Sequence, residues 1–284
     1  MYRVLLDPNA ISETTDWDVV ALLQDAQLSS LVQFGPDPPS SIVDRVADSR
    51  AKAAVRAALV RLRDRNRLLT CADIGVAQPC GVAPFVCAHE RAFATVLVAA
   101  QPGFIDGLKI YGLQNYLAGP LHPMLTNHDY SILDRAPRRT WEDRVWRPLL
   151  TAARSATIID YLAGDNCREF ANTFAWLKDQ FSLSSVYPVS VTLYSSCSGN
   201  SQQIRGLCKE LGWTLKLREY RANTNDSLPH DRYIITDRLG VQVGRGFNLC
   251  TGGVSEIRDS AIYVCGDPAS VINKANRAPR VTKL

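Results

Sequence analysis

The chain has 284 residues, of which 46% are hydrophobic and 21% are charged, and its formal net charge is +4. This composition indicates an ordinary globular protein rather than a disordered one, and the length is sufficient for two domains. Residues 1–11 lack the basic start and apolar core of a secretory signal, and the longest apolar stretch, residues 92–100, is too short to cross a bilayer. We therefore expect a cytoplasmic protein of two domains with no transmembrane segment.

Residues 1–140 are predicted to form a separate N-terminal α+β domain whose fold the sequence does not assign. A strand is expected over residues 2–6 and a helix over residues 16–27. Ser40 and Ser41 can cap a long Ala-rich helix that continues to Leu62 or beyond. Arginines crowd its second half and could face a nucleic acid, although a solvated helix C-terminus explains them more simply. They are Arg56, Arg61, Arg63, Arg65 and Arg67.

Eight cysteines are present, and a cytoplasmic location predicts that they are reduced thiols rather than disulfides. Cys71, Cys80, Cys87 and His89 are close enough in the sequence for a zinc site to be considered. Their spacing contains no C-x2-C pair, which structural zinc sites commonly have. We therefore predict no structural metal and no cofactor.

Residues 141–272 show a more regular pattern and are predicted to form a second domain. Residues 141–150 are expected to be helical, with tryptophans that act as packing anchors. Strands and helices then alternate, and Gly212 ends the second helix as a C-cap. This order predicts an α/β sandwich around a mixed sheet. One expected helix begins near residue 167, and a second spans residues 201–211. The expected strands are 157–162, 189–194, 214–220, 233–236, 241–243 and 261–264.

The most informative stretch is residues 230–237, which read His-Asp-Arg-Tyr-Ile-Ile-Thr-Asp. The β-branched run predicts a strand, so His230 and Arg232 project from one face and can reach one ligand. An imidazole and a guanidinium are suited to act on a phosphodiester, because one supplies a nucleophile or a proton and the other a fixed positive charge. Asp237, just past the strand, could orient the imidazole or pair with the arginine.

A glycine-rich turn follows, and we expect it to form an antiparallel hairpin with the His230 strand. Gly244 and Gly246 flank Arg245, so that backbone N–H groups and a guanidinium could approach an anion closely. Asn248 adds an amide. Together the two segments predict a phosphate-binding site.

Two other segments are secondary candidates for the same site. Asp160 closes the first predicted strand of the second domain, at the carboxyl end where α/β folds place their ligands. The loop over residues 195–200 leads into a helix N-terminus and could hold an anion, although a plain Ser or Asn cap is the simpler interpretation.

These residues resemble the phospholipase D-like superfamily, whose signature is H-x-K-x4-D followed by G-S-x-N. His230, Asp237 and Asn248 stand in the matching places, Arg232 takes the lysine position, and residues 244–246 replace Gly-Ser with one extra residue. The likeness is greater to the phospholipase D-like C-terminal domain of MIT-domain proteins, where a His-Asp-Arg strand is likewise followed by a Gly-Arg-Gly turn. The resemblance covers roughly residues 146–265.

The resemblance implies a phospholipase D-like fold and two alternative functions. The first is a metal-independent phosphodiesterase, acting on nucleic acid through a phosphohistidine. Enzymes of this kind use two motif histidines and this chain has one copy, so the resemblance implies a homodimer that brings two His230 side chains together. Arg232, Asn248 and Arg245 would then hold the phosphoryl oxygens. Family analogy also suggests a component of a bacterial phage-defence operon, with operon partner proteins.

The second function is a non-catalytic module that binds an anion, a lipid headgroup or a protein partner. The branch with the Gly-Arg-Gly turn is generally regarded as non-catalytic, and Arg232 and Arg245 both depart from the active pattern. Residues 273–284 form a basic tail with no acidic residue, which could meet a polyanion, although a solvated disordered tail is the simpler interpretation.

Overall fold

The computed structural model divides the chain into two compact α/β units. One comprises Met1–His128 and Arg147–Ala152, and the other comprises Asp129–Trp146 and Ala153–Leu284. The second unit therefore begins before the predicted boundary at residue 141. The residues that the structure describes are 2–6, 15–34, 39–69, 96–98, 103–105, 108–111, 113–118, 129–132, 138–150, 152–185, 187–222, 224, 226–244, 246–247, 249–250 and 260–281.

The first unit contains a six-stranded sheet in the order β3-β2-β1-β4-β6-β5. Five neighbouring strands are parallel, and only β5 runs antiparallel, against β6. The expected strand at residues 2–6 is confirmed as β1. The strands are β1 (Tyr2–Leu6), β2 (Ser30–Phe34), β3 (Leu68–Leu69), β4 (Val96–Val98), β5 (Gly103–Ile105) and β6 (Leu108–Tyr111).

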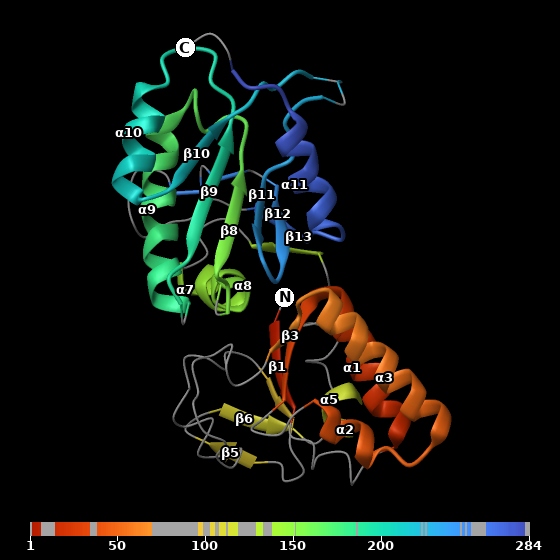
Figure 1. Ribbon diagram of the computed structural model, residues 1–284. Helices are drawn as coiled ribbons and strands as arrows, with labels where there is room; N and C mark the ends of the chain where they lie inside the picture. The colour runs from red at the N-terminus through yellow and green to blue at the C-terminus, as the bar shows by residue number, and fades with distance from the viewer. Residues whose placement is uncertain are drawn as a thin grey trace. The chain divides into compact units, whose positions relative to one another are not determined.

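Helices α1 and α3 pack against each other beside this sheet (Figure 1). Their apolar faces supply most of the core residues that the structure describes in the first unit, including Val19, Leu23, Val55 and Leu62. The helix expected at residues 16–27 is therefore confirmed. The helices are α1 (Asp16–Ser29), α2 (Ser40–Arg45), α3 (Ser49–Asp64), α5 (Leu113–Ala118) and the short α8 (Arg147–Leu150).

The single long helix predicted from Ser40 is interrupted in the structure. The backbone becomes extended at Val46, and Asp48 caps α3 by accepting a hydrogen bond from the N–H of Ala51 at 2.7 Å. The carboxylate of Asp16 also accepts the N–H groups of Ala47 and Asp48, at 3.0 and 2.6 Å. Because both amides are bonded to a side chain, they cannot continue the helix.

The second unit contains a seven-stranded mixed sheet in the order β10-β9-β8-β11-β12-β13-β7. Strands β8, β9 and β10 are parallel, whereas β11, β12, β13 and β7 are antiparallel to their neighbours. The predicted hairpin is confirmed, because β11 pairs with β12 through Ile234 and Val241. The strands are β7 (Asp129–Ile132), β8 (Ser155–Ile159), β9 (Ser190–Ser195), β10 (Thr214–Leu217), β11 (Tyr233–Thr236), β12 (Gly240–Val243) and β13 (Ser260–Val264).

Helices α9 (Cys167–Ser184) and α10 (Gln202–Leu211) lie on one face of this sheet, and α11 (Pro268–Arg277) lies on the other (Figure 1). Gly212 ends α10 in the left-handed conformation, with φ of 72°, as predicted for a C-cap. The predicted helical segment at residues 141–150 comprises α7 (Arg138–Trp141), a π-helical turn (Glu142–Trp146) and α8. Trp141 and Trp146 are fully buried and stack on each other, which confirms them as packing anchors.

The predicted basic tail is ordered over much of its length. Residues 273–277 form the last turns of α11, and Ala275 within it and Ala278 just after it pack with Ile159 and Ile235 of the sheet. Arg280 then pairs with Arg218 in an isolated antiparallel bridge. Among the described residues, each helix is too short or too polar to span a membrane.

Candidate active site

The candidate site lies along one edge of the seven-stranded sheet. Tyr161 follows the carboxyl end of β8, and Tyr220 lies beyond the carboxyl end of β10. Strand β11 runs antiparallel to β8 with Tyr233 opposite Ile159, so the residues just before it come to the same edge. His230 and Arg232 therefore lie beside Tyr161. This is the edge at which open α/β sheets usually place their ligands.

His230 and Arg232 converge on the hydroxyl group of Tyr161. Nε2 of His230 lies 3.4 Å from this oxygen, and Nη2 of Arg232 donates to it at 3.5 Å. The guanidinium of Arg232 also lies over the Tyr161 ring, 5.0 Å from its centroid. The two side chains thus reach one common point, and a ligand at that point stays a prediction. Both polar contacts are at the long end of the hydrogen-bond range. Catalytic groups often have such long contacts to each other when no substrate is bound.

The His230 ring is accessible and has a carboxylate on its other side. Its side chain is 64% exposed, and Nδ1 lies 3.6 Å from Oδ1 of Asp231. Oδ2 of Asp231 accepts the hydroxyl of Tyr233 at 3.4 Å, and burial raises the pKa of Tyr233 to about 12, so this hydroxyl stays a donor. A carboxylate near Nδ1 favours the tautomer that leaves Nε2 unprotonated, which is the form a nucleophilic histidine needs.

Asp160 lies near Arg232, because both side chains come close to Gly246 and the charge of Arg232 acts on the carboxylate. It is fully buried, and its carboxylate accepts the N–H groups of Leu162 at 3.0 Å and Phe247 at 3.1 Å. Burial raises its pKa to about 6, a shift that the two backbone N–H groups and the positive charge of Arg232 partly oppose. The charge on this carboxylate, and hence the field at Arg232, therefore changes near pH 6. Its place just past the carboxyl end of β8 is as predicted from the sequence, whereas its part in phosphate binding stays a prediction.

The glycine-rich turn supports Asp160 rather than presenting free N–H groups to an anion. The N–H of Gly244 donates to the carbonyl of Ala261 at 2.8 Å, and that of Gly246 donates to Val243 at 2.9 Å. The expectation that these two amides bind phosphate is therefore wrong. Gly246 has φ of 74°, and a Cβ there would lie 2.6 Å from Oδ2 of Asp160. Glycine is required because the backbone covers this buried carboxylate.

Asp237 is not part of this site, contrary to the sequence interpretation. It follows the far end of β11, and its Oδ1 accepts the N–H groups of Arg154 at 2.9 Å and Ser155 at 3.3 Å. It therefore holds the start of β8 at the opposite edge of the sheet. Arg245 and Asn248, the other predicted phosphate ligands, lie outside the described residues.

Two aromatic residues of the site were missed as candidates. Tyr161 and Tyr220 stack on each other, with ring centroids 4.0 Å apart, and the His230 ring lies 5.3 Å from Tyr161 and 6.1 Å from Tyr220. Each tyrosine comes two or three residues after the carboxyl end of a parallel strand. Ligands commonly bind at that end, so this position could have identified both tyrosines from the sequence.

The loop over residues 195–200 acts as a helix cap, which confirms the simpler interpretation. Oδ1 of Asn200 accepts the N–H of Gln202, the first residue of α10, at 2.8 Å. The hydroxyl of Ser195 is buried and donates to the carbonyl of Asp160 at 2.7 Å. The loop thus joins the carboxyl ends of β8 and β9 beneath the site.

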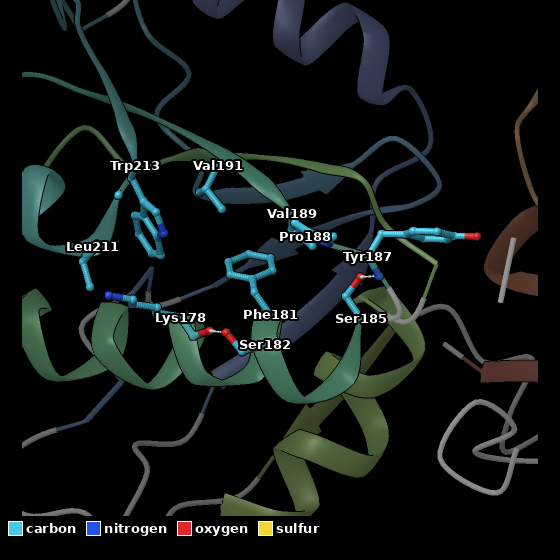
Figure 2. Close-up of a pocket in the computed structure, with 11 residues that line it drawn as sticks. Lys178, Phe181, Ser182, Ser185, Tyr187, Pro188, Val189, Val191, Leu211 and Trp213 are labelled. Carbon is cyan, nitrogen blue, oxygen red and sulfur yellow. Dashed lines mark hydrogen bonds between the residues drawn. The ribbon is translucent and has the colours of Figure 1, made fainter. Parts of the chain in front are cut away.

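A separate cavity of about 460 Å³ lies between α9 and the first residues of β9 and β10 (Figure 2). Phe181 and Trp213 form its apolar wall, and Lys178 lies at its rim, where Nζ donates to the carbonyl of Glu210. Val191 near the start of β9 and Trp213 just before β10 place this cavity at the amino ends of these strands. It is therefore remote from His230.

Within the part of the chain that the structure describes, no three His, Cys, Asp or Glu side chains are grouped in a way that could hold a metal ion. Cys167, Cys197, Cys208, Cys250 and Cys265 are buried free thiols. Cys71, Cys80, Cys87 and His89 lie outside the described residues, so the absence of zinc there stays a prediction.

Comparison with known proteins finds no family model that matches this chain and no curated protein that matches it. The assignment of function therefore depends on the site itself.

Proposed function

We propose that the second unit is a phospholipase D-like phosphodiesterase, which uses His230 to cleave nucleic acid and needs no metal ion. The observation that carries the proposal is the convergence of Nε2 of His230 and Nη2 of Arg232 on the Tyr161 hydroxyl. A phosphoryl group at this point would meet a nucleophile, a fixed cation and a hydroxyl donor. These are the groups that in-line attack on phosphorus needs when no metal supplies the charge.

In the first step, Nε2 of His230 forms a bond to phosphorus, and the bond from phosphorus to the leaving oxygen breaks. Arg232 offsets the negative charge on the non-bridging oxygens. The leaving oxygen takes a proton from a protonated histidine. In the second step, water attacks phosphorus and the bond between phosphorus and His230 breaks. The histidine that gave up its proton in the first step accepts the proton of the water.

The proton donor in this scheme is His230 of the partner subunit. His230 is the only histidine among the described residues, and none of the other three in the sequence has the motif spacing. The proposal therefore requires a homodimer in which two copies of the Tyr161 edge face each other. A setting in phage defence follows from the resemblance alone and stays a prediction.

The alternative proposal is a non-catalytic module that binds an anion. One observation favours it: Nε of Arg232 is buried and has no hydrogen-bond partner among the described residues, and the group lies beside the Asp160 carboxylate. Part of the positive charge of Arg232 is thereby offset, which weakens its action on a transition state more than on a resting anion.

The two proposals are separated by a cleavage assay in EDTA with single- and double-stranded DNA and RNA. The phosphodiesterase proposal expects cleavage by wild type, none by His230→Ala, and loss of both binding and turnover in Arg232→Ala. Arg50→Ala is the charge control, because it removes an exposed arginine from α3 of the first unit. Binding without cleavage, with the variants changing affinity only, would establish the anion-binding module.

A further inference from the structure

A second cavity of about 410 Å³ adjoins the Tyr161 edge of the sheet. It is lined by residues 196–198 after β9, residues 219–221 after β10, and Val281. Tyr220 belongs to both places, because it lines the cavity and also stacks on Tyr161. Ser196 is joined to the site as well, since its N–H donates to the carbonyl of Tyr161 at 3.3 Å. A ligand held at His230 can therefore continue into this cavity.

The cavity combines an aromatic wall with polar groups of both kinds. Tyr220 offers ring surface, Glu219 offers acceptor oxygens, and Arg221 offers N–H donors; the last two side chains form an ion pair. A flat ring that stacks on tyrosine and carries donors and acceptors around its edge fits this set, whereas an acyl chain or a bare phosphate does not. Nucleobases have these properties, and proteins commonly bind unpaired bases in this way.

The charges beside the cavity suit a polyanion. Arg218 and Arg280 lie directly opposite each other in their antiparallel bridge, and each immediately precedes a residue that lines the cavity. Like charges in directly opposed positions are destabilising. In addition, Nε of Arg218 is buried and has no hydrogen-bond partner within the described part of the chain. A phosphate backbone that passes the two arginines would offset the repulsion between their charges.

We propose that the substrate is a single-stranded nucleic acid, and that the base next to the reacting phosphodiester stacks on Tyr220 within this cavity. The backbone then passes Arg218 and Arg280. A base inside a duplex is paired and stacked on its neighbours, so it cannot enter without being extruded. This inference rests on the proposed function and names the substrate class for the same site.

The test is a binding measurement in EDTA, by fluorescence anisotropy, with the full chain carrying His230→Ala so that no strand is cut. The probes are a labelled single-stranded DNA 12-mer, the matching duplex, and a 12-mer of abasic sites. Tyr220→Ala should weaken binding of the single strand by about tenfold or more, because one stacked base is lost. Tyr220→Phe keeps the ring and should bind as the parent does. The duplex and the abasic strand should bind weakly and respond little to Tyr220→Ala.

Arg221→Gln provides a second variant in case Tyr220→Ala does not fold, since the Arg221 side chain is 62% exposed. It should reduce the preference for the 12-mer over the abasic strand several-fold. The inference is overturned if the abasic strand or the duplex binds as tightly as the 12-mer, if neither variant changes that preference, or if phosphatidylinositol vesicles bind and the 12-mer does not. Failure of the proposed function is a separate result: the 12-mer binds through Tyr220, yet wild type does not cleave it.

Discussion

The carboxylate of Asp237 accepts a hydrogen bond from the backbone N–H of Arg154 at 2.9 Å. This bond, with the adjacent one to Ser155, gives Asp237 a structural role at the end of the sheet remote from His230. We predict that Asp237→Ala lowers the free energy of unfolding by about 1–3 kcal/mol, because two backbone donors lose a charged acceptor.

The turnover of Asp237→Ala on nucleic acid should match that of wild type below its melting temperature. Asp226→Ala is the control, since it removes an exposed carboxylate and should change stability by less than about 0.5 kcal/mol. Urea titration and initial rates measure both properties. A folded Asp237→Ala protein with greatly reduced turnover would return this residue to the active site.

Gly246 is predicted to be intolerant of any side chain. Gly246→Ala places a Cβ 2.6 Å from Oδ2 of Asp160 and 2.9 Å from Cγ of Arg232, at a backbone φ of 74°. We expect a loss of about 2 kcal/mol or more in stability, together with weaker anion binding, because Arg232 must move. Gly206→Ala within α10 is the matched control: a Cβ there meets nothing within 4 Å, and helix propensity should stabilise the protein by about 0.5–1 kcal/mol. Thermal melting of the two variants checks the contrast, and equal effects would contradict it.

The titration of Asp160 should be visible in the pH dependence of stability. Its pKa is raised from 3.8 to about 6 by burial, so between these values the folded protein holds a proton that the unfolded chain has lost. The contribution of Asp160 to the free energy of unfolding should therefore fall as pH rises through this window, by about 3 kcal/mol in total, and stay constant above it.

The Asp160→Asn variant isolates this effect because asparagine does not titrate. The stability of wild type minus that of the variant, from urea titrations at a series of pH values, should decrease from about pH 4 to pH 6. A difference that is flat or rises over this range would show that the carboxylate is not held in the buried environment described.

Much of the second unit follows from local sequence patterns. Strand β11 was predicted with the bounds it has, and an antiparallel hairpin between it and the segment that leads into the glycine-rich turn was expected. Asp160 was identified because the carboxyl end of a strand is a local feature. The alternating pattern of the unit also sufficed for a mixed sheet with helices on its faces.

The errors arise where distant residues decide the structure. Seven residues from His230 to Asp237 span about 20 Å when extended, so the two ends of the motif reach opposite edges of the sheet. The break between α2 and α3 depends on Asp16, more than 30 positions earlier in the chain. Tyr220 contacts Tyr161 because both follow strands of the same parallel group, β10-β9-β8, whose carboxyl ends lie together. No local propensity encodes such contacts.

The dimer in the proposed mechanism makes a quantitative prediction for mixtures of subunits. Wild type and His230→Ala, combined at different ratios and allowed to exchange, should show cleavage proportional to the square of the wild-type fraction, because one active dimer needs two His230 side chains. Light scattering should give twice the mass of one chain. Activity proportional to the wild-type fraction itself, or a monomer that cleaves, would rule out the shared site.

The central claim is that His230 attacks phosphorus, and trapping the covalent intermediate tests it most directly. Wild type in EDTA is mixed with a single-stranded oligonucleotide, quenched in alkaline denaturant within the first turnover, and digested for mass spectrometry. An alkaline quench is used because phosphohistidine is more stable in alkali than in acid. We predict that the peptide containing His230 gains the mass of a phosphoryl-linked nucleotide fragment, and that His230→Ala yields no adduct. Metal-free cleavage by wild type with no adduct on His230, or an adduct that persists in His230→Ala, would contradict the claim.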